Sequence, residues 1–317
     1  MKSRVLLTGA SGFVGNATLQ VLSTDPNLEI YAVSRTKPMF LPDSVTWKSI
    51  DLTSYTDVQE YLAWIKPNKL VHAAWNTTHG DYWTCESNLV WVSASLNLLK
   101  AFKYAGGRRV LMVGTSAEYD WTTPPLQEDN STIRPKSLYG VCKNALREIV
   151  ESYCIQEELS WVWTRLFCVY GPMENPKKLF SKTAVSLINN ELVGFTGGHE
   201  HRDFLHVHDV ALAIVAVLGS GLSGPVNIGS GQAVSIREFV ELVALVLGKS
   251  DMLVFKDDPN ICLVREECVV ASTIKLVAGT GWHARLPLAK GVKMACNDLL
   301  YCRQHQDFFQ ANNIVAE

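Results

Sequence analysis

Residues 8–15, TGASGFVG, constrain the fold of this chain more than any other segment. Their glycines follow the apolar run RVLL and precede a segment whose apolar residues have helical spacing. In a strand–turn–helix unit of this kind, the first glycine makes the tight turn, the second lets the backbone approach a pyrophosphate, and the third lets helix and strand pack closely. The helix N-terminus then supplies amide donors for phosphate groups. We therefore expect a dinucleotide to contact Gly9, Ser11, Gly12, Phe13, Val14 and Gly15.

The rest of the N-terminal half alternates between strand-like and helix-like segments. Short apolar runs predict strands at residues 4–9, 28–34, 69–74, 109–115 and 160–167. The segments between these runs carry apolar residues at helical spacing. Such alternation predicts an α/β fold with a Rossmann-type, doubly wound parallel sheet and right-handed crossovers.

The alternation loosens after YGP, residues 170–172. Further helices are expected at about residues 178–191, 208–218, 235–247 and 288–304, with a short strand at 225–229. We therefore expect a dinucleotide-binding domain at residues 1–170, to which segments around 203–230 return. Residues 171–317 are expected to form mainly a smaller, mixed α/β substrate lobe, interleaved with the first. In this architecture ligands bind in the cleft between the two parts.

Composition excludes several classes of partner. The formal net charge is −2 and no lysine- or arginine-rich run occurs, which argues against a nucleic-acid surface. The eight cysteines include no CxxC pair and have mostly apolar neighbours, so we expect reduced core thiols. No apolar stretch is long enough to span a bilayer, and the first residues lack a signal-peptide layout. We therefore expect a soluble, cytoplasmic protein.

The end of the second predicted strand, YAVSRTK, bears on the choice of dinucleotide. Folds that prefer NAD usually carry an acidic residue about twenty residues after the glycine turn. Here Ser34 and Arg35 stand there instead, and such a pair can accept the 2′-phosphate of NADP(H). We therefore expect NADP(H) to be favoured over NAD(H); the alternative is that these are surface residues of a loop. Further cofactor contacts are expected from Asp51, Leu52, Ala73 and Ala74.

The motif YGVCK places Tyr139 and Lys143 four residues apart on a predicted helix, so both face the same side. A free tyrosine has a pKa of about 10 and is a poor acid or base at neutral pH. A neighbouring ammonium and an oxidised nicotinamide are expected to lower the pKa of Tyr139, which can then exchange a proton with a carbonyl or alcohol oxygen. The Thr115 hydroxyl is expected to hydrogen-bond the same oxygen. Tyr139 and Lys143 are also expected to contact the cofactor.

Together these motifs resemble the extended short-chain dehydrogenase/reductase superfamily of nucleotide-sugar epimerases, dehydratases and reductases. The resemblance covers nearly the whole chain. It includes TRLFCVYGP (164–172), HRDFLHVHDVA (201–211), VNIGSG (226–231) and GTGWHARLPLAKGV (279–292). The segments TSAEYDW and HAAW…DYW are similar to those of nucleotide-sugar 4-ketoreductases. One departure is Cys168, where the family often has asparagine.

The resemblance implies a nucleoside-diphosphate sugar as substrate, bound in the lobe after YGP, and no metal. It makes Arg202 and Arg265 candidates for binding the diphosphate, because a guanidinium fork suits phosphate oxygens. Asp209 is expected to be structural. Relatives of this type often form homodimers through the helices that include the YxxxK motif. The residues expected to line the substrate are Trp75, Ser116 and Ala117, besides the two arginines.

The residue at position 117 bears on the reaction. In relatives that dehydrate the sugar, a carboxylate two residues before the closing tyrosine of this strand end moves the protons of the elimination. Ala117 stands there in this chain, and Glu118 is displaced by one residue, which on a strand turns its side chain to the opposite face.

We therefore expect an NAD(P)-dependent oxidoreductase that uses NADPH to reduce the 4-keto group of a nucleoside-diphosphate 4-keto-6-deoxyhexose. The main alternative is an NAD-dependent nucleotide-sugar 4-epimerase, which needs the same Thr115, Tyr139 and Lys143. A 4,6-dehydratase lacks its base here. A non-catalytic NADP-sensing regulator fits less well, because such proteins usually lose the tyrosine or the lysine.

Overall fold

The computed structural model describes residues 2–78, 80–256 and 267–304. Its main feature is a seven-stranded sheet in the order β11-β6-β5-β4-β1-β2-β3. The strands are β1 (Ser3–Thr8), β2 (Leu28–Ser34), β3 (Val45–Ser49), β4 (Lys69–His72), β5 (Arg109–Thr115), β6 (Ser160–Leu166) and β11 (Gly224–Ile228). All neighbouring strands of this sheet are parallel. The predicted doubly wound α/β fold is therefore confirmed.

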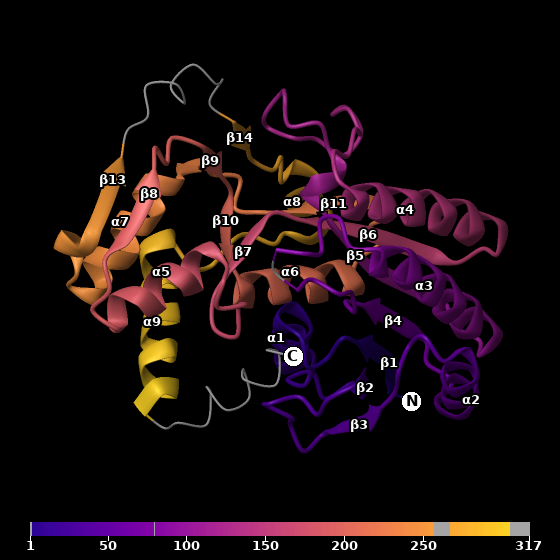
Figure 1. Ribbon diagram of the computed structural model, residues 1–317. Coiled ribbons are helices and arrows are strands. Elements are labelled where there is room, and N and C mark those ends of the chain that lie inside the picture. Colours follow the sequence, from indigo (N-terminus) through magenta and orange to yellow (C-terminus); the bar gives the residue numbers. More distant parts are fainter. Residues whose placement is uncertain (1, 79, 257–266, 305–317) are drawn as a thin grey trace.

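Helices cover both faces of this sheet (Figure 1). One layer contains α2 (Tyr55–Ile65), α3 (Ser87–Tyr104) and α4 (Leu138–Gln156), and the other contains α1 (Phe13–Leu22), α6 (Val207–Gly219) and α8 (Ile274–Thr280). Alternate strand residues supply the two cores, because successive side chains of a strand point to opposite faces. In β1, Leu6 packs in the core of the first layer, whereas Val5 and Leu7 pack in that of the second.

The remaining elements pack into a second group, on the left of Figure 1. Its helices are α5 (Leu179–Ile188), α7 (Ile236–Leu247) and α9 (Leu288–Gln304). Its short strands are β7 (Cys168–Tyr170), β8 (Val193–Thr196), β9 (His201–Arg202), β10 (Phe204–His206), β12 (Val234–Ser235), β13 (Leu253–Lys256) and β14 (Cys268–Val269). Short 3-10 helices, η1 (Ser116–Glu118) and η2 (Ser250–Met252), complete the described elements. The strand expected at 225–229 is β11, which returns to the main sheet. The domain boundaries themselves stay a prediction.

Two buried aspartates of HRDFLHVHDVA fix backbone that joins these two groups of elements. Asp203 accepts hydrogen bonds from the amides of Ser230 (2.6 Å), Gly231 (3.0 Å) and Ala271 (3.1 Å). Asp209, near the start of α6, accepts from the amides of residues 285 and 286 at 3.0 and 2.9 Å. Both carboxylates therefore bind main chain, which agrees with the structural role expected for Asp209.

Candidate active site

The glycine turn lies between β1 and α1, where it also contacts the end of β4. Gly9 has a φ of 73°, and a Cβ there would lie 2.7 Å from the amide nitrogen of Ala74. A Cβ on Gly15 would lie 2.0 Å from the carbonyl oxygen of Gly9. Gly12 caps α1 with no side-chain hydrogen bond to the helix amides. A backbone turn that has no room for a Cβ at Gly9 and Gly15, next to helix amides without a side-chain cap, fits the pyrophosphate of a dinucleotide.

The loop after β2 contacts this turn. The Ser34 hydroxyl is buried, donates to the carbonyl of Thr36 (2.7 Å) and accepts from the indole N–H of Trp47 (3.0 Å). Thr36 in turn donates to the hydroxyl of Ser11, 3.1 Å away. Arg35 is exposed. Of the expected serine–arginine pair, the structure therefore presents the arginine at the surface, while the serine hydroxyl is already hydrogen-bonded within the protein.

Asp51 and Leu52, which follow β3, lie in different environments. Asp51 is exposed, and its carboxylate accepts hydrogen bonds from the amide (2.9 Å) and hydroxyl (2.8 Å) of Thr53. These bonds, helped by the charge of Arg35, lower the pKa of Asp51. Leu52 is buried in the core between the sheet and the layer of α2, α3 and α4. Asp51 and Arg35 therefore share one edge of the sheet, whereas Leu52 is a packing residue.

Tyr139 and Lys143 occupy successive turns of α4, and both are buried. The Lys143 ammonium donates to the carbonyl of Val113 in β5, 2.9 Å away. The Tyr139 side chain forms a hydrogen bond with that of Thr115, the last residue of β5. The helix begins at this point because Ser137 caps it, accepting from the amide of Gly140 at 3.2 Å. The structure thus brings together the hydroxyl, phenol and ammonium that the sequence predicted.

The protein's own groups do not lower the pKa of Tyr139 as expected. Burial raises this pKa, the hydrogen bond with Thr115 opposes the rise, and Tyr82 and Glu118 add to it. Burial also lowers the pKa of Lys143 to about 7, against the attraction of Glu118. The expectation treated Lys143 as a full positive charge, but desolvation weakens that charge and stabilises the neutral phenol. The chain alone therefore keeps Tyr139 in its acid form.

The Glu118 carboxylate contacts Arg165 and Trp163 in the interior of the protein. The carboxylate is fully buried, 2.7 Å from Nε of Arg165 and 2.9 Å from the indole N–H of Trp163. It also accepts from the amide of Thr115 (2.9 Å), while the Thr115 hydroxyl accepts from Ala117 (3.2 Å). Glu118 points away as expected, but the reason differs. β5 ends at Thr115 and the chain turns into η1, so a capped helical turn directs the carboxylate, not strand alternation.

The neighbours of Glu118 close a buried network. Nη1 of Arg165 donates to the hydroxyl of Tyr119 (2.9 Å), which donates to the side-chain oxygen of Asn227 in β11 (2.9 Å). The carbonyl of Ser116 accepts from the indole N–H of Trp121 at 2.8 Å. Ser116 therefore contributes its backbone to the turn, in addition to the side chain expected to line the substrate.

Aromatic residues from the segment after β4 surround Tyr139. Its ring meets Tyr82 edge-on at 5.0 Å between centroids, Trp83 at 5.7 Å and Trp75 at 6.3 Å. Its amide donates to the carbonyl of Trp83 at 3.1 Å. Sequence reasoning had placed Trp75 at the substrate. The structure places it beside the two α4 residues of the YxxxK motif.

Asn88, in the first turn of α3, holds this segment and was not indicated by the sequence. Its side-chain oxygen accepts from the indole N–H of Trp75 (2.9 Å). Its side-chain nitrogen donates to the carbonyls of Tyr82 (2.7 Å) and Cys85 (2.8 Å). Asn88 belongs to no motif, so its local sequence did not indicate this role.

Of the two arginines expected to bind the diphosphate, the structure describes Arg202. Arg202, in β9, donates to the carbonyls of His201 and Glu267 at 3.0 Å each and pairs with the Glu267 carboxylate. Its guanidinium also lies 5.8 Å from the ring centroid of Trp121. Arg265 lies outside the described residues. Phosphate binding by either arginine stays a prediction.

The histidine-rich segment around Asp203 has no metal-binding geometry in the part of the chain that the structure describes. No group of three or more His, Cys, Asp or Glu side chains there could hold a metal ion. His206 instead caps α6, accepting from the amide of His208 at 3.1 Å.

None of the helices searched among the described residues is long and apolar enough to cross a membrane.

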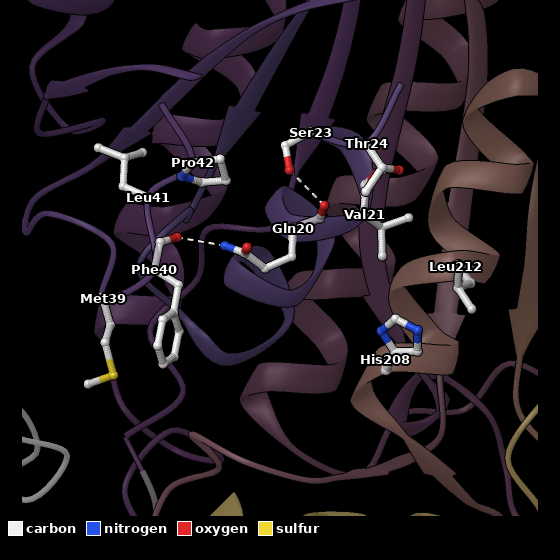
Figure 2. A pocket seen from close by; sticks show the side chains of 10 residues that line it. All are labelled: Gln20, Val21, Ser23, Thr24, Met39, Phe40, Leu41, Pro42, His208 and Leu212. Atoms are coloured by element: carbon white, nitrogen blue, oxygen red, sulfur yellow. Dashed lines mark hydrogen bonds between the residues drawn. The ribbon is translucent and has the colours of Figure 1, made fainter. Parts of the chain in front are cut away.

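A surface hollow of about 770 Å³ lies apart from these residues. Figure 2 shows it between α1, residues 39–42 and α6, where the Gln20 side chain donates to the carbonyl of Phe40 at 2.6 Å. None of the residues expected to bind cofactor or substrate lines this hollow. We assign the chemistry to the Thr115, Tyr139 and Lys143 cluster, because the hollow contains no comparable acid–base pair.

Residues 5–229 match the model of the NAD dependent epimerase/dehydratase family. The match spans the glycine turn, Thr115 and YGVCK, and it covers more than half of the 317 residues. The chain belongs to this family. The predicted superfamily is therefore confirmed, whereas a particular closeness to the 4-ketoreductases stays a prediction.

Named relatives of this family member differ in their reactions. The chain is 26% identical over 332 residues to UDP-glucuronic acid decarboxylase 1 of Xenopus tropicalis, covering 98% of this chain and 75% of that protein. It is 27% identical over 309 residues to human dTDP-D-glucose 4,6-dehydratase, covering 92% and 88%. The UDP-glucose 4-epimerase of Thermus thermophilus, solved with NAD, has a TM-score of 0.80 at 24% identity, covering 94% and 99%. The two sequence relatives are enzymes of nucleotide sugars, and the solved structure shows a shared fold.

Proposed function

We propose that this protein reduces the 4-keto group of a nucleoside-diphosphate 4-keto-6-deoxyhexose with NADPH. The observation that carries the proposal is the pairing of Glu118 with Arg165, which leaves a hydroxyl, a phenol and an ammonium at the end of β5. Those groups suit proton transfer at an oxygen. They do not supply the carboxylate that an elimination across a carbon–carbon bond requires.

The glycine turn and Arg35 would hold the dinucleotide. A nicotinamide bound there would supply hydride chemistry at the sugar carbon. Tyr139 gives its proton to the carbonyl oxygen, and the Thr115 hydroxyl orients that oxygen beside it. The raised pKa of Tyr139 supports the acid role, because a neutral phenol is the form that reduction consumes. Lys143 adds positive charge near the phenol as negative charge develops on it.

NADPH is preferred in this proposal because Arg35 is exposed at the end of β2 and Lys37 is exposed nearby. A guanidinium suits the 2′-phosphate that distinguishes NADP from NAD. The sequence motif also lacks the acidic residue that usually binds the ribose hydroxyls of NAD.

The second candidate is an NAD-dependent nucleotide-sugar 4-epimerase. The fold shared with the NAD-bound Thermus enzyme favours it, and Thr115, Tyr139 and Lys143 serve that reaction equally well. Asp51 gives it some support, because its carboxylate lies at the same edge of the sheet as Arg35. In an epimerase Tyr139 must first accept a proton as the phenolate, a form that its raised pKa disfavours.

The test is a panel of nucleoside-diphosphate sugars incubated with purified protein, the 4-keto-6-deoxy sugars with NADPH or NADH and the 4-hydroxy sugars with NAD+. Stoichiometric loss of reduced nicotinamide with a 4-keto-6-deoxy sugar supports the reductase. Conversion of a 4-hydroxy sugar to its 4-epimer without net consumption of NAD+ would favour the epimerase. Turnover of no sugar nucleotide would contradict both.

We also propose that the protein forms a homodimer through α3 and α4. These neighbouring helices expose a set of large apolar side chains: Leu89, Val90, Val141, Ile149 and Ile155. A surface on which such side chains gather is suited to association with another protein. Sedimentation of the wild type as a dimer and of Ile149→Asp as a folded monomer would support this surface, whereas a monomeric wild type at micromolar concentration would rule it out.

A further inference from the structure

Lys143 has an unusual partner for a buried ammonium. Its nitrogen lies 3.8 Å from the centroid of the Trp75 ring. Among the described residues its one hydrogen bond is to the carbonyl of Val113, and the ring of Trp163 is more distant at 6.0 Å. An aromatic face attracts a cation through its quadrupole, most strongly when both are desolvated. Besides that carbonyl, the face of Trp75 is therefore a group in direct contact with Lys143 that favours its charged form.

Trp75 is itself held in place from two directions. Its indole N–H donates to Asn88 at 2.9 Å, and its ring stacks on that of Trp91 with 6.2 Å between centroids and 30° between planes. Asn88 in turn binds two backbone carbonyls of the segment after β4. A ring fixed in this way presents its face to Lys143 with little freedom to move away.

The described titratable groups around Lys143 do not themselves offer an unpaired negative charge that would stabilise its ammonium. Glu118, from η1, favours the ammonium, but its carboxylate is paired with Arg165. His72, from β4, is bonded to the hydroxyls of residues 8 and 95, and burial lowers its pKa to about 3, so it is neutral. Tyr139, on the same helix as Lys143, keeps its proton. None of the three provides a free negative charge beside the lysine.

We propose that Trp75 is a positioning residue, whose ring keeps the Lys143 ammonium charged and directed at the site where Tyr139 transfers its proton. The proposal rests on the proposed function only for the role of Lys143 in turnover. The contact between the ring and the ammonium is a property of the protein itself. It can therefore be tested without substrate.

The experiment is an NMR titration of Lys143 in protein labelled with 13C at the lysine ε-carbon, with the resonance assigned by its absence in Lys143→Arg. We expect the pKa of Lys143 to fall by about half a pH unit in Trp75→Leu, equivalent to about 0.7 kcal/mol. In Trp75→Phe, which keeps a weaker ring, we expect a smaller fall. The matched control is Trp64→Leu, at an exposed tryptophan of α2, which should leave this pKa unchanged.

The sign of the shift separates the two roles that Trp75 can have. If the ring only fills space, its removal admits water, relieves the desolvation of Lys143 and raises the pKa. An unchanged or raised pKa in Trp75→Leu would therefore overturn the proposal. Should Trp75→Leu fail to fold, the direction of the shift in Trp75→Phe decides in the same way.

Turnover separates this inference from the proposed function. If Lys143 acts as an ammonium in the reductase, the alkaline limb of the kcat/KM profile moves to lower pH in Trp75→Leu, in step with the NMR value. A shift seen by NMR in a protein that reduces none of the sugar nucleotides would retain the role of Trp75 and reject the function.

Discussion

Arg165 and Lys143 are two buried cations near the end of β5, and the protein treats them differently. Arg165 has Glu118 at 2.7 Å and the hydroxyl of Tyr119 at 2.9 Å, so its charge is paired and hydrogen-bonded. Lys143 has one carbonyl and the face of Trp75. A buried cation that is fully paired keeps its charge and belongs to the structural support of the fold. A poorly paired one has a lowered pKa and loses its proton more easily. The Glu118–Arg165 pair therefore supports the site, whereas Lys143 belongs to the part that we expect to exchange protons.

The largest expected effect is on the reactive side of this comparison. Tyr139→Phe removes the proton donor and should reduce kcat by about 10²–10⁴-fold. The fold should persist, because the ring and its aromatic neighbours remain. Steady-state rates and the urea unfolding midpoint check both statements, with Tyr104→Phe at an exposed position as the matched control. Unimpaired turnover by the variant would remove Tyr139 from the mechanism.

On the scaffold side, Glu118→Ala should reduce the free energy of unfolding by about 3–5 kcal/mol. The loss arises because Arg165 would be left buried without its counter-charge. Urea denaturation measures it. The control is Glu148→Ala, whose pair with Arg147 is largely exposed on the glutamate side and should change stability by less than about 1 kcal/mol. Equal losses in the two variants would mean that burial of the Glu118 pair has no special weight.

The weak pairing of Lys143 should appear as a pH dependence of stability. Burial lowers its pKa from 10.5 to about 7, so between these values the unfolded chain binds more protons than the folded one. Lys143 therefore costs stability below pH 7, and the cost disappears as the pH rises toward 10. Lys143→Met should be the more stable protein at pH 6, by ~1–3 kcal/mol, with the gap closing at alkaline pH.

Denaturant titrations of wild type and Lys143→Met at several pH values give this gap directly. Lys100→Met, at an exposed position of α3, should show no such dependence. A gap that stays constant from pH 6 to 10 would show that Lys143 is protonated throughout, and would place it with Arg165 in the comparison.

The smallest expected effect concerns an exposed cation, Arg35. Arg35→Ala should reduce the ratio of kcat/KM for NADPH to that for NADH by about tenfold, equivalent to about 1.4 kcal/mol. Arg108→Ala, exposed at the opposite end of the sheet, should leave the ratio unchanged. A ratio unaffected by Arg35→Ala would favour the interpretation of this segment as an ordinary surface loop.

Local patterns predicted the parts of the molecule that depend on local chemistry. The glycine turn, the strand ending at Thr115 and the helix bearing Tyr139 and Lys143 were all placed correctly, because each follows from residues close in sequence. β3 was missed as a strand. Its residues 46, 48 and 49 are polar and exposed at the edge of the sheet, so its apolar pattern is weak.

Contacts between distant residues were beyond prediction. The Trp47 bond that occupies the Ser34 hydroxyl, the pairing of Glu118 with Arg165 and the contact of Trp75 with Lys143 all join different elements. No spacing rule specifies them, because they depend on how strands and helices meet in space. The environments of Thr115, Tyr139 and Lys143 are set by such contacts, and for this reason the cluster could be predicted from the sequence but its pKa shifts could not.

The returning strand β11 has a consequence for how the protein is made. Asn227, in β11, accepts a hydrogen bond from Tyr119 and donates one to the carbonyl of Leu126 at 2.8 Å. It thus links the segment after β5 to a strand about a hundred residues later in the chain. A growing chain that has reached only α6 still lacks this edge strand. More than two thirds of the protein must therefore be synthesised before the hydrogen-bond network of Arg165, Tyr119 and Asn227 can form. Until then the edge of β6 is open to incorrect strand pairing.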